Sequence, residues 1–342
     1  MNSEARSPDG PSLRSLISGY ETCQVVYVAA RLGVADLLAE EPRTAEDLAQ
    51  ALHVDVGALQ RILRALAALG LLAHLGGSRY ALAPSGTRLR DGVPGSLRAV
   101  ALLAGERSYR AWGGLLHSVR TGETAFQHVF GMGTFEYMAA HPEVAGIYND
   151  AMAAGAAERA AAVVAAYDFS RSGVVVDVGG GHGALLIAIL AASPGLRGVL
   201  FERESVTPGA RVRIEAAGLD SRCAVVSGDF FRSVPREGDL YLLSHIIHNW
   251  DDRKSGSILA NCRAAMSPGA KLLILEQVLP ERFAPSSSAA RVAMADLHML
   301  AITGGQERSA GQYQALLVAA GFTLTSVTGT AVAESLVEGV AI

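Results

Sequence analysis

Short apolar runs and longer segments with helical spacing alternate through the second half of the chain. The apolar runs predict strands at 173–178, 198–202, 223–227, 239–244 and 270–276, with a closing pair near 322–328 and 331–341. Helices are expected between them, and right-handed crossovers would make the first five strands parallel. This half of the chain is therefore predicted to be an α/β domain.

The first third of the chain has a different pattern. Apolar positions recur at helical spacing over residues 12–40, and Thr44 to Asp47 resembles a capping box. A second apolar stripe runs from Leu59 to Leu66, and a hairpin is expected around Gly76–Ser78. Helices followed by a hairpin predict a winged helix, a fold that often binds DNA.

A DNA-binding role is disfavoured by the charge of this segment. The helix that would enter a groove offers only Arg61 and Arg64 as cations, and the first helices are too apolar to be solvated. A second subunit is the simplest cover for such a surface. Residues 1–105 are therefore predicted to form a winged-helix dimerisation domain.

Residues 106–165 are predicted to form a helical bridge that contributes to a substrate pocket, and residues 166–342 a catalytic domain. An Ala-rich helix is expected from about Glu143 to Ala166. Tyr148 and Met152 are four residues apart, so they share one face of that helix.

Composition excludes several classes of protein. Half of the 342 residues are apolar, and the formal net charge of −4 gives no basic surface for nucleic acid or anionic membrane. Three widely spaced cysteines suggest reduced thiols rather than a disulfide framework. Met1 to Pro11 is polar, without a signal core, and no apolar run approaches a membrane span. A cytoplasmic protein is expected.

A glycine-rich loop follows the first strand of the predicted α/β domain. Val174 to Gly183 reads VVVDVGGGHG, where Gly179, Gly181 and Gly183 allow sharp turns and close approach to a ligand. Ligands of open α/β sheets bind at the carboxyl ends of the strands. Gly179, Gly181 and Ala184 also fit the dinucleotide fingerprint, so the loop alone leaves a nicotinamide dehydrogenase open.

Carboxylates at three successive strand ends favour another cofactor. Asp177 precedes the loop, Glu202 ends the next strand, and Asp229 follows the third beside Phe230. Asp177 would repel a pyrophosphate but would welcome an ammonium group. The three acids together suit a small cationic nucleoside, S-adenosylmethionine.

The downstream motifs resemble those of small-molecule O-methyltransferases. They are Tyr241 to Asp252 (YLLSHIIHNWDD), Leu273 to Glu276, Asp296 to Leu300 and Gly304 to Arg308. In order and spacing they are similar to the caffeate and flavonoid enzymes of plants and to the methyltransferases of aromatic polyketide antibiotic pathways. The resemblance implies a class I methyltransferase fold, a Rossmann-like sheet of seven strands with an antiparallel final strand, and an N-terminal domain that forms a homodimer.

The resemblance also implies a catalytic group. His248 matches the family's general base, and Glu276 and Glu307 match the acids that flank it. A phenol with a pKa of about 10 is ionised in roughly one molecule per thousand at pH 7, so a base is useful. Asn249 departs from the usual aspartate after the histidine.

The same resemblance places the remaining site residues. Cofactor-binding residues are expected to be Asp177, Gly179, Gly181, Glu202, Asp229, Phe230 and Ser244. Ser244 occupies a position where plant relatives have lysine. Acceptor-binding residues are expected to be Trp112, Phe126, Tyr148, Met152, His245, His298 and Met299, whose aromatic, imidazole and thioether groups suit a flat apolar acceptor. No metal ligands are expected.

Three alternatives to methyl transfer stay open at this point. Some members of the family bind S-adenosylmethionine but carry out hydroxylation, decarboxylation or pericyclic steps on polyketides. A winged-helix regulator and a nicotinamide dehydrogenase are the others. The motifs favour an O-methyltransferase that acts on an aromatic small molecule in bacterial natural-product biosynthesis.

Overall fold

The computed structural model describes residues 12–236 and 238–342, so the polar segment Met1–Pro11 considered above lies outside the described residues. Two compact units divide the chain. The first comprises the described residues up to Arg110 together with Met138–Ala154, and the second comprises Ala111–Tyr137 and Gly155–Ile342. The predicted bridge, residues 106–165, is thus distributed over both units.

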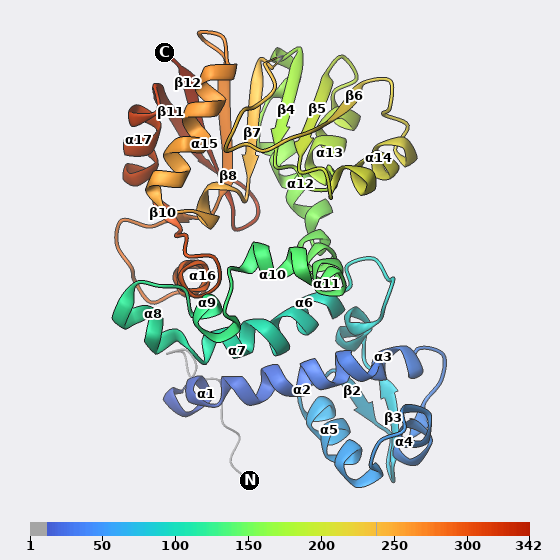
Figure 1. Ribbon diagram of the computed structural model, residues 1–342. Coiled ribbons are helices and arrows are strands. Elements are labelled where there is room, and N and C mark those ends of the chain that lie inside the picture. Colours follow the sequence, from blue (N-terminus) through green and yellow to red (C-terminus); the bar gives the residue numbers. More distant parts are fainter. Residues whose placement is uncertain (1–11, 237) are drawn as a thin grey trace. The chain divides into compact units, whose positions relative to one another are not determined.

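The first unit is mostly helical (Figure 1). Its elements are α1 (Leu13–Ile17), α2 (Gly19–Leu32), α3 (Val34–Leu37), β1 (Arg43–Thr44), α4 (Ala45–Leu52), α5 (Val56–Ala68), β2 (Leu72–His74), β3 (Arg79–Leu82), a 3-10 segment (Pro84–Leu89), α6 (Arg98–Leu103), a π-helical turn (Ala104–Ser108) and α11 (Pro142–Ala153). The capping box at Thr44 and Asp47 and the predicted hairpin, β2 with β3, are confirmed.

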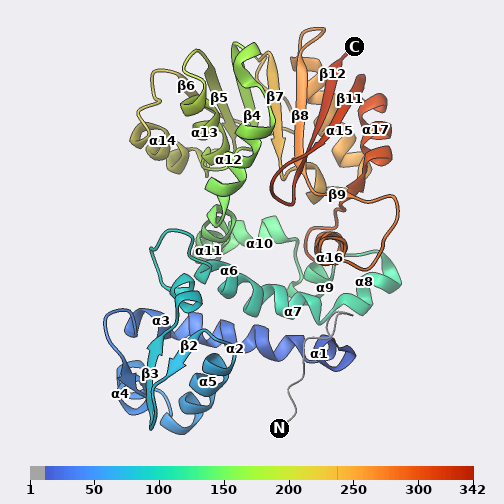
Figure 2. The ribbon, with the colours of Figure 1, turned by 180° about the vertical axis from the view of Figure 1, so that it is seen from behind.

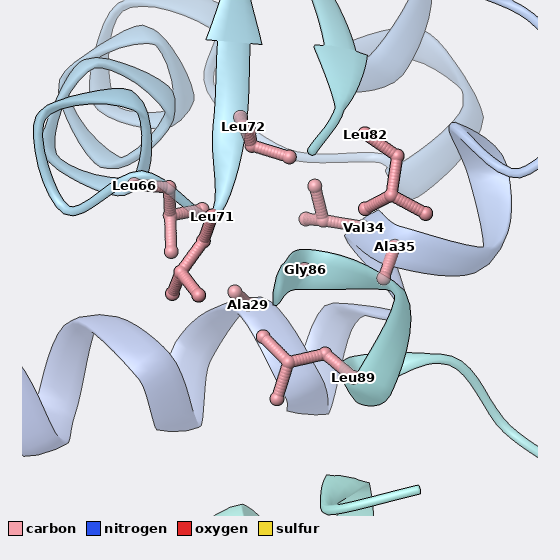
Figure 3. A pocket seen from close by; sticks show the side chains of 9 residues that line it. All are labelled: Ala29, Val34, Ala35, Leu66, Leu71, Leu72, Leu82, Gly86 and Leu89. Atoms are coloured by element: carbon pink, nitrogen blue, oxygen red, sulfur yellow. The ribbon is translucent and has the colours of Figure 1, made fainter. Parts of the chain in front are cut away.

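Apolar side chains hold α2, α4, α5 and the hairpin together. Leu48, Leu63, Leu66 and Tyr80 are buried in one core. Figure 3 shows the neighbouring Leu66, Leu71, Leu72, Leu82 and Leu89 around a void of only about 10 Å³. A void of this size reflects close packing rather than a ligand pocket.

The second unit is built around a seven-stranded sheet of order β11-β12-β8-β7-β4-β5-β6 (Figures 1 and 2). Its strands are β4 (Val174–Val178), β5 (Arg197–Glu202), β6 (Cys223–Ser227), β7 (Leu240–Ser244), β8 (Lys271–Glu276), β11 (Phe322–Gly329) and β12 (Ser335–Ala341). The first five are parallel, and β12 runs antiparallel to β8. The predicted strands and the final antiparallel strand are confirmed.

Helices cover both faces of this sheet. One apolar core includes α15 (Asp252–Ala265) and α17 (Ala310–Ala319), and the other includes α12 (Ala156–Ala166), α13 (Ala184–Ala192) and α14 (Thr207–Ala216). The remaining elements are α7 (Tyr109–Trp112), α8 (Leu115–Thr121), α9 (Ala125–Phe130), α10 (Thr134–Ala140), 3-10 turns at Phe169–Arg171 and Ile247–Asn249, α16 (Ser287–Ile302), and the short pair β9 (Val278–Leu279) and β10 (Arg308–Ser309).

The single Ala-rich helix expected from about Glu143 to Ala166 is wrong. The structure divides it into α11 and α12, because Ala154 is extended and Gly155 is left-handed, with a φ of 73°. A left-handed residue cannot continue an α-helix, and glycine accepts that conformation at low cost.

Among the helices of residues 12–236 and 238–342, none is both long enough and apolar enough to cross a bilayer.

Candidate active site

The loop after β4 is shaped by three glycines. Gly179, Gly181 and Gly183 have φ values of 74°, 58° and 81°. A Cβ at Gly180 would lie 2.3 Å from Asp177 Oδ2, so the loop closes tightly over that carboxylate. The predicted turn is confirmed, and it leaves backbone atoms bare at the carboxyl edge of the sheet.

Asp177 lies beneath this loop and is buried. Neither of its carboxylate oxygens has a hydrogen-bond partner in the structure. Burial, together with the nearby carboxylate of Glu202, raises the pKa of Asp177 to about 7. A buried carboxylate without a partner is costly, and a cationic ligand would relieve that cost. This environment fits the ammonium group of S-adenosylmethionine and opposes a pyrophosphate.

Glu202 ends β5 beside the same loop. Its carboxylate accepts hydrogen bonds from the backbone N–H groups of Gly181 (3.2 Å) and Arg203 (2.7 Å). The structure therefore brings Asp177, Glu202 and the glycine loop together. A carboxylate has about four lone-pair sites, so Glu202 can still accept from the hydroxyls of a ribose.

Asp229 and Phe230 follow β6. The Asp229 carboxylate accepts from the backbone N–H of Phe231 at 2.9 Å and is half exposed. Phe230 packs edge-on against Phe231, with the ring centroids 5.0 Å apart. Ser244 ends β7, the central neighbour of β4. These residues complete the carboxyl edge at which the predicted cofactor residues lie.

His248 is held between two buried glutamates just beyond β7. Its Nδ1 lies 2.9 Å from Oε1 of Glu307, and its backbone N–H donates to Oε1 of Glu276 at 3.0 Å. Tyr313 donates its hydroxyl to Oε2 of Glu276. The imidazole is 12% exposed, whereas both carboxylates are buried. The structure thus brings together the three residues that were predicted to be catalytic.

The pKa of His248 results from opposing influences. Burial, the largest, lowers it, but the charges of Glu276 and Glu307 and the hydrogen bond that His248 donates to Glu307 raise it, so the pKa lies above the usual value for histidine. Because Nδ1 faces Glu307, this nitrogen carries the proton in the neutral ring, and Nε2 keeps its lone pair. The ring can therefore accept a proton at Nε2 and share the resulting charge with two carboxylates.

Arg308 fixes the backbone that carries His248. Its guanidinium is fully buried and pairs with Asp252 at 2.8 Å. It also donates to the carbonyl oxygens of Ile247 (3.2 Å) and Trp250 (2.9 Å), on either side of His248. The sequence predicted a structural Arg308 that pairs with an acid, and the pair with Asp252 confirms this. The contacts to the two carbonyl oxygens and the hydroxyl of Tyr313 were not predicted.

His245 adopts an uncommon backbone conformation, with a φ of 55°. The side-chain amide of Asn249 donates to its carbonyl oxygen at 2.8 Å, a bond that an aspartate could not make. The imidazole Nε2 lies 3.4 Å from Oε1 of Glu334, and its ring centroid is 5.4 Å from that of His248. The departure at Asn249 thus acquires a structural role, and Glu334 is a neighbour that sequence reasoning missed.

The residues predicted to bind an acceptor fall into separate settings. Trp112 donates a hydrogen bond to His298, and Met299 follows His298 on α16. Phe126 is buried against Phe130 and Tyr137, which gives it a packing role. Tyr148 and Met152 belong to α11 of the first unit, and the other five residues belong to the second unit.

A cavity of about 540 Å³ opens within the second unit, close to the His245–Glu334 pair. It is lined by Gly155, Glu158, Arg159, Ser288, Arg291, Val292, Ala331, Val332, Ala333 and Glu334. Charges of both signs line it, and the nearby Arg159 and His245 lower the pKa of Glu334 against the opposing effect of burial. None of the predicted acceptor residues lines this cavity.

The cluster of His248, Glu276 and Glu307 also has the composition of a metal site. One ligand atom from each of His248, Glu276 and Glu307 lies within 4.8 Å of the others. Both oxygens of Glu276 and one of Glu307 are already hydrogen-bonded inside the protein, whereas Oε2 of Glu307 has no partner. The internal bonds favour a proton-transfer cluster over a metal centre, and a chelator distinguishes the two.

The chain matches two protein-family models. Residues 112–323 match the O-methyltransferase domain, and residues 15–90 match the O-methyltransferase dimerisation domain. Among curated relatives, the phenazine O-methyltransferase PhzM of Lysobacter antibioticus is 44% identical over 326 residues, covering 95% of this chain and 94% of the relative. The O-demethylpuromycin-O-methyltransferase of Streptomyces alboniger is 42% identical, covering 92% and 84%.

A solved structure adds the bound cofactor. The O-methyltransferase NcsB1 from neocarzinostatin biosynthesis, in complex with S-adenosylmethionine and 2-hydroxy-5-methyl naphthoic acid, has a TM-score of 0.85 at 32% identity, covering 97% of this chain and 99% of that one. Relatives that methylate nitrogen occur too. The 8-amino-8-demethylriboflavin N,N-dimethyltransferase of Streptomyces davaonensis is 35% identical, covering 89% and 87%.

Proposed function

This chain belongs to the S-adenosylmethionine-dependent O-methyltransferase family, and from that premise we propose that it methylates a phenolic hydroxyl of an aromatic small molecule, with His248 as general base. The observation that carries the proposal is the His248 imidazole between the buried carboxylates of Glu307 and Glu276. The relatives act on natural products, and we place this enzyme in the same kind of bacterial pathway.

S-Adenosylmethionine, when bound, supplies a methyl group made electrophilic by a positively charged sulfur. The protein has to orient the acceptor hydroxyl and exclude water. His248 removes the hydroxyl proton at Nε2 as the oxygen becomes a nucleophile, which is worth about 10²–10⁴-fold in rate. Glu307 fixes the tautomer and, with Glu276, stabilises the imidazolium that forms, as the aspartate does in a hydrolase triad.

The cofactor side of the site is assigned to the carboxyl edge of the sheet. Asp177 and the backbone of Gly179 and Gly181 would hold the methionine portion, because the carboxylate has no partner among the residues that the structure describes. Glu202 would accept from the ribose hydroxyls. Asp229 would accept from the adenine amino group while Phe230 packs on the ring. Ser244, shorter than lysine, would contribute at most a hydroxyl near the methionine carboxylate.

The acceptor is assigned to the surroundings of His248. We propose that Trp112, His245, His298 and Met299 contact it directly, and that Phe126 shapes the pocket from behind. Tyr148 and Met152, which lie on α11, stay predictions. Hydroxyl methylation is favoured over amine methylation or a non-methylating reaction on a polyketide, because a neutral amine needs no base before attack, whereas a phenol does.

We further propose that residues 1–105 form a homodimer through a winged-helix domain, that residues 166–342 bind the cofactor, and that the enzyme is cytoplasmic. The dimer is supported by the matched dimerisation domain and by an exposed apolar face at the first helices. Leu13, Leu16 and Ile17 are 73%, 63% and 68% exposed, and Tyr20 follows one turn later. Such a face calls for a partner surface.

The dimer proposal predicts a monomer when that face is made acidic. Combining Leu16→Glu with Ile17→Glu should raise the dissociation constant at least about 100-fold, because each buried side chain of this size contributes about 1.5–3 kcal/mol. Light scattering over a dilution series measures it. Val212→Glu, a change of equal type on exposed α14, is the matched control. An unchanged dimer in the double variant would contradict the assignment.

A direct test of the activity uses a panel of phenols and naphthols with S-adenosylmethionine, with and without EDTA. We expect products heavier by 14 daltons, the mass of CH₂, formed equally in both conditions. Calorimetry with S-adenosylmethionine and with NAD checks the cofactor. Tight NAD binding without a response to S-adenosylmethionine would contradict the proposal, and loss of activity in EDTA would assign the His248 cluster to a metal.

Because Glu307 is charged, we expect its replacement to change how the rate of methyl transfer depends on pH. The neutral form of His248 is the active one, so the rate should fall as the pH falls through its raised pKa. Glu307→Gln removes two influences that raise this pKa, and the acid limb should therefore move to lower pH while the maximal rate drops modestly. A pH–rate profile of both proteins measures this. If the acid limb of the Glu307→Gln profile stayed at the wild-type pH, a group other than His248 would titrate in that range.

A further inference from the structure

The ring of His298 accepts a hydrogen bond from the indole of Trp112, a group that can donate a hydrogen bond but cannot accept one. The Nε1–H of Trp112 points at Nδ1 of His298 across 3.1 Å, and the two rings are 6.2 Å apart at 31°. An indole nitrogen has no lone pair to offer, so Nδ1 of His298 must accept. The hydrogen of the neutral ring is therefore on Nε2.

This arrangement opposes protonation of His298. A second proton would have to occupy Nδ1, where it would face the indole N–H. Burial, the larger effect, lowers the pKa of His298, and positive charge on His248 lowers it further. With Nδ1 occupied and a hydrogen on Nε2, the ring has no free lone pair. It can donate a hydrogen bond but cannot act as a second base.

The helix that carries His298 is anchored beside the general base. The N–H of Gln306, just beyond α16, donates to the carbonyl oxygen of His248 at 2.9 Å. Asp296, two residues before His298, accepts from the N–H of Glu307 at 2.9 Å. Glu307 in turn holds the ring of His248. These hydrogen bonds, all within the second unit, therefore connect the segment that carries His298 to His248.

We propose that Trp112 holds His298 as an obligate hydrogen-bond donor, and that this donor selects aromatic acceptors carrying a second lone-pair atom beside the hydroxyl that is methylated. The second atom is a ring nitrogen or an oxygen. An acceptor that places a C–H in that position covers the N–H of His298 without pairing it, so such an acceptor should bind less tightly. The inference rests on the proposed function and narrows its substrate class.

The experiment compares matched probe pairs. 8-Hydroxyquinoline and 1-naphthol differ by one ring nitrogen beside the hydroxyl, and 2,3-dihydroxynaphthalene and 2-naphthol differ by one oxygen. Binding is measured by calorimetry with S-adenosylhomocysteine present, and methylation separately with S-adenosylmethionine, both in EDTA. At least one pair should show a preference of about tenfold or more for the lone-pair member, and the pairs distinguish nitrogen from oxygen.

Two variants test whether the preference for the lone-pair acceptors comes from the N–H of His298. His298→Phe keeps a flat ring but has no N–H, so it should bring the ratio within each pair close to one. Trp112→Phe removes only the indole N–H and should reduce the ratio in part. The ¹⁵N shifts of the His298 ring should report a neutral Nε2–H form in the wild-type protein at pH 7.

Several results would overturn the inference. They are a ratio near one for both pairs in the wild-type protein, a ratio that His298→Phe leaves unchanged, and a His298 ring that is an imidazolium or carries its hydrogen on Nδ1. Preserved binding preference without methyl transfer would instead contradict the proposed function. The two failures are therefore distinguishable.

Discussion

Replacing His248 by alanine is expected to slow methyl transfer by about 10²-fold or more. The physical reason is the small ionised fraction of a phenol at neutral pH, which leaves attack dependent on a group that removes the proton. His248 is placed for this task by Glu307 at 2.9 Å and by the backbone bond to Glu276. Affinity for S-adenosylmethionine should change little, because Asp177, Glu202 and Asp229, which are proposed to bind it, follow other strands. Single-turnover kinetics and calorimetry measure the two quantities.

A second variant separates loss of the base from loss of packing. His248→Ala leaves Glu307 buried with neither oxygen hydrogen-bonded, which alone could disturb the site. His248→Asn keeps an N–H that can donate to Glu307 but cannot accept a proton near neutral pH. Both variants should lose a similar factor in rate. If asparagine restored most of the activity, His248 would be a positioning residue rather than the base.

Replacing Arg308 by alanine is expected to lower the free energy of unfolding by at least about 3 kcal/mol. Its fully buried guanidinium donates to the carbonyl oxygens of Ile247 and Trp250 and to Asp252. A hydrogen bond from a charged donor contributes about 1.5–3 kcal/mol, and two such bonds to backbone carbonyls would be lost. Urea denaturation measures the change. The rate of methyl transfer should fall as well, because the segment held by Arg308 carries His248.

Two further substitutions serve as controls for the contacts of Arg308. Arg308→Lys keeps the charge but cannot reach several acceptors at once, so most of the stability should still be lost. Asp252→Asn removes the charge at the solvent side of the pair, where the side chain is 65% exposed. Its cost should be below about 1 kcal/mol. A large loss for Asp252→Asn and a small one for Arg308→Lys would show that charge rather than backbone capping matters.

Much of the second unit could be predicted because each signal is local. The apolar runs at Val174–Val178 and Lys271–Glu276 are buried strands, and such strands are recognisable by their composition. The glycine loop and the acids at Asp177 and Glu202 follow those strands directly. Position in a parallel sheet then brings them to one edge, since all carboxyl ends meet there.

Contacts between distant segments could not be predicted in this way. Trp112 and His298 are 186 residues apart, and Tyr313 lies on a helix where nothing distinguishes it from a core tyrosine. The left-handed backbone of His245 has no local marker either, because a histidine takes that conformation only when its surroundings impose it. The break at Gly155 was missed because alanines on both sides favour helix so strongly.

The claim at the centre of this account is that His248 is the general base of a phenol methyltransferase. The most direct test is the single-turnover rate of methyl transfer as a function of pH for the wild-type enzyme and His248→Ala, with the best acceptor of the panel. The wild-type rate should fall on acidification through the raised pKa of His248, and the variant should be slower by about 10²-fold at neutral pH and lack that limb. A variant rate within a few-fold of wild type across the whole range would remove the base from the mechanism.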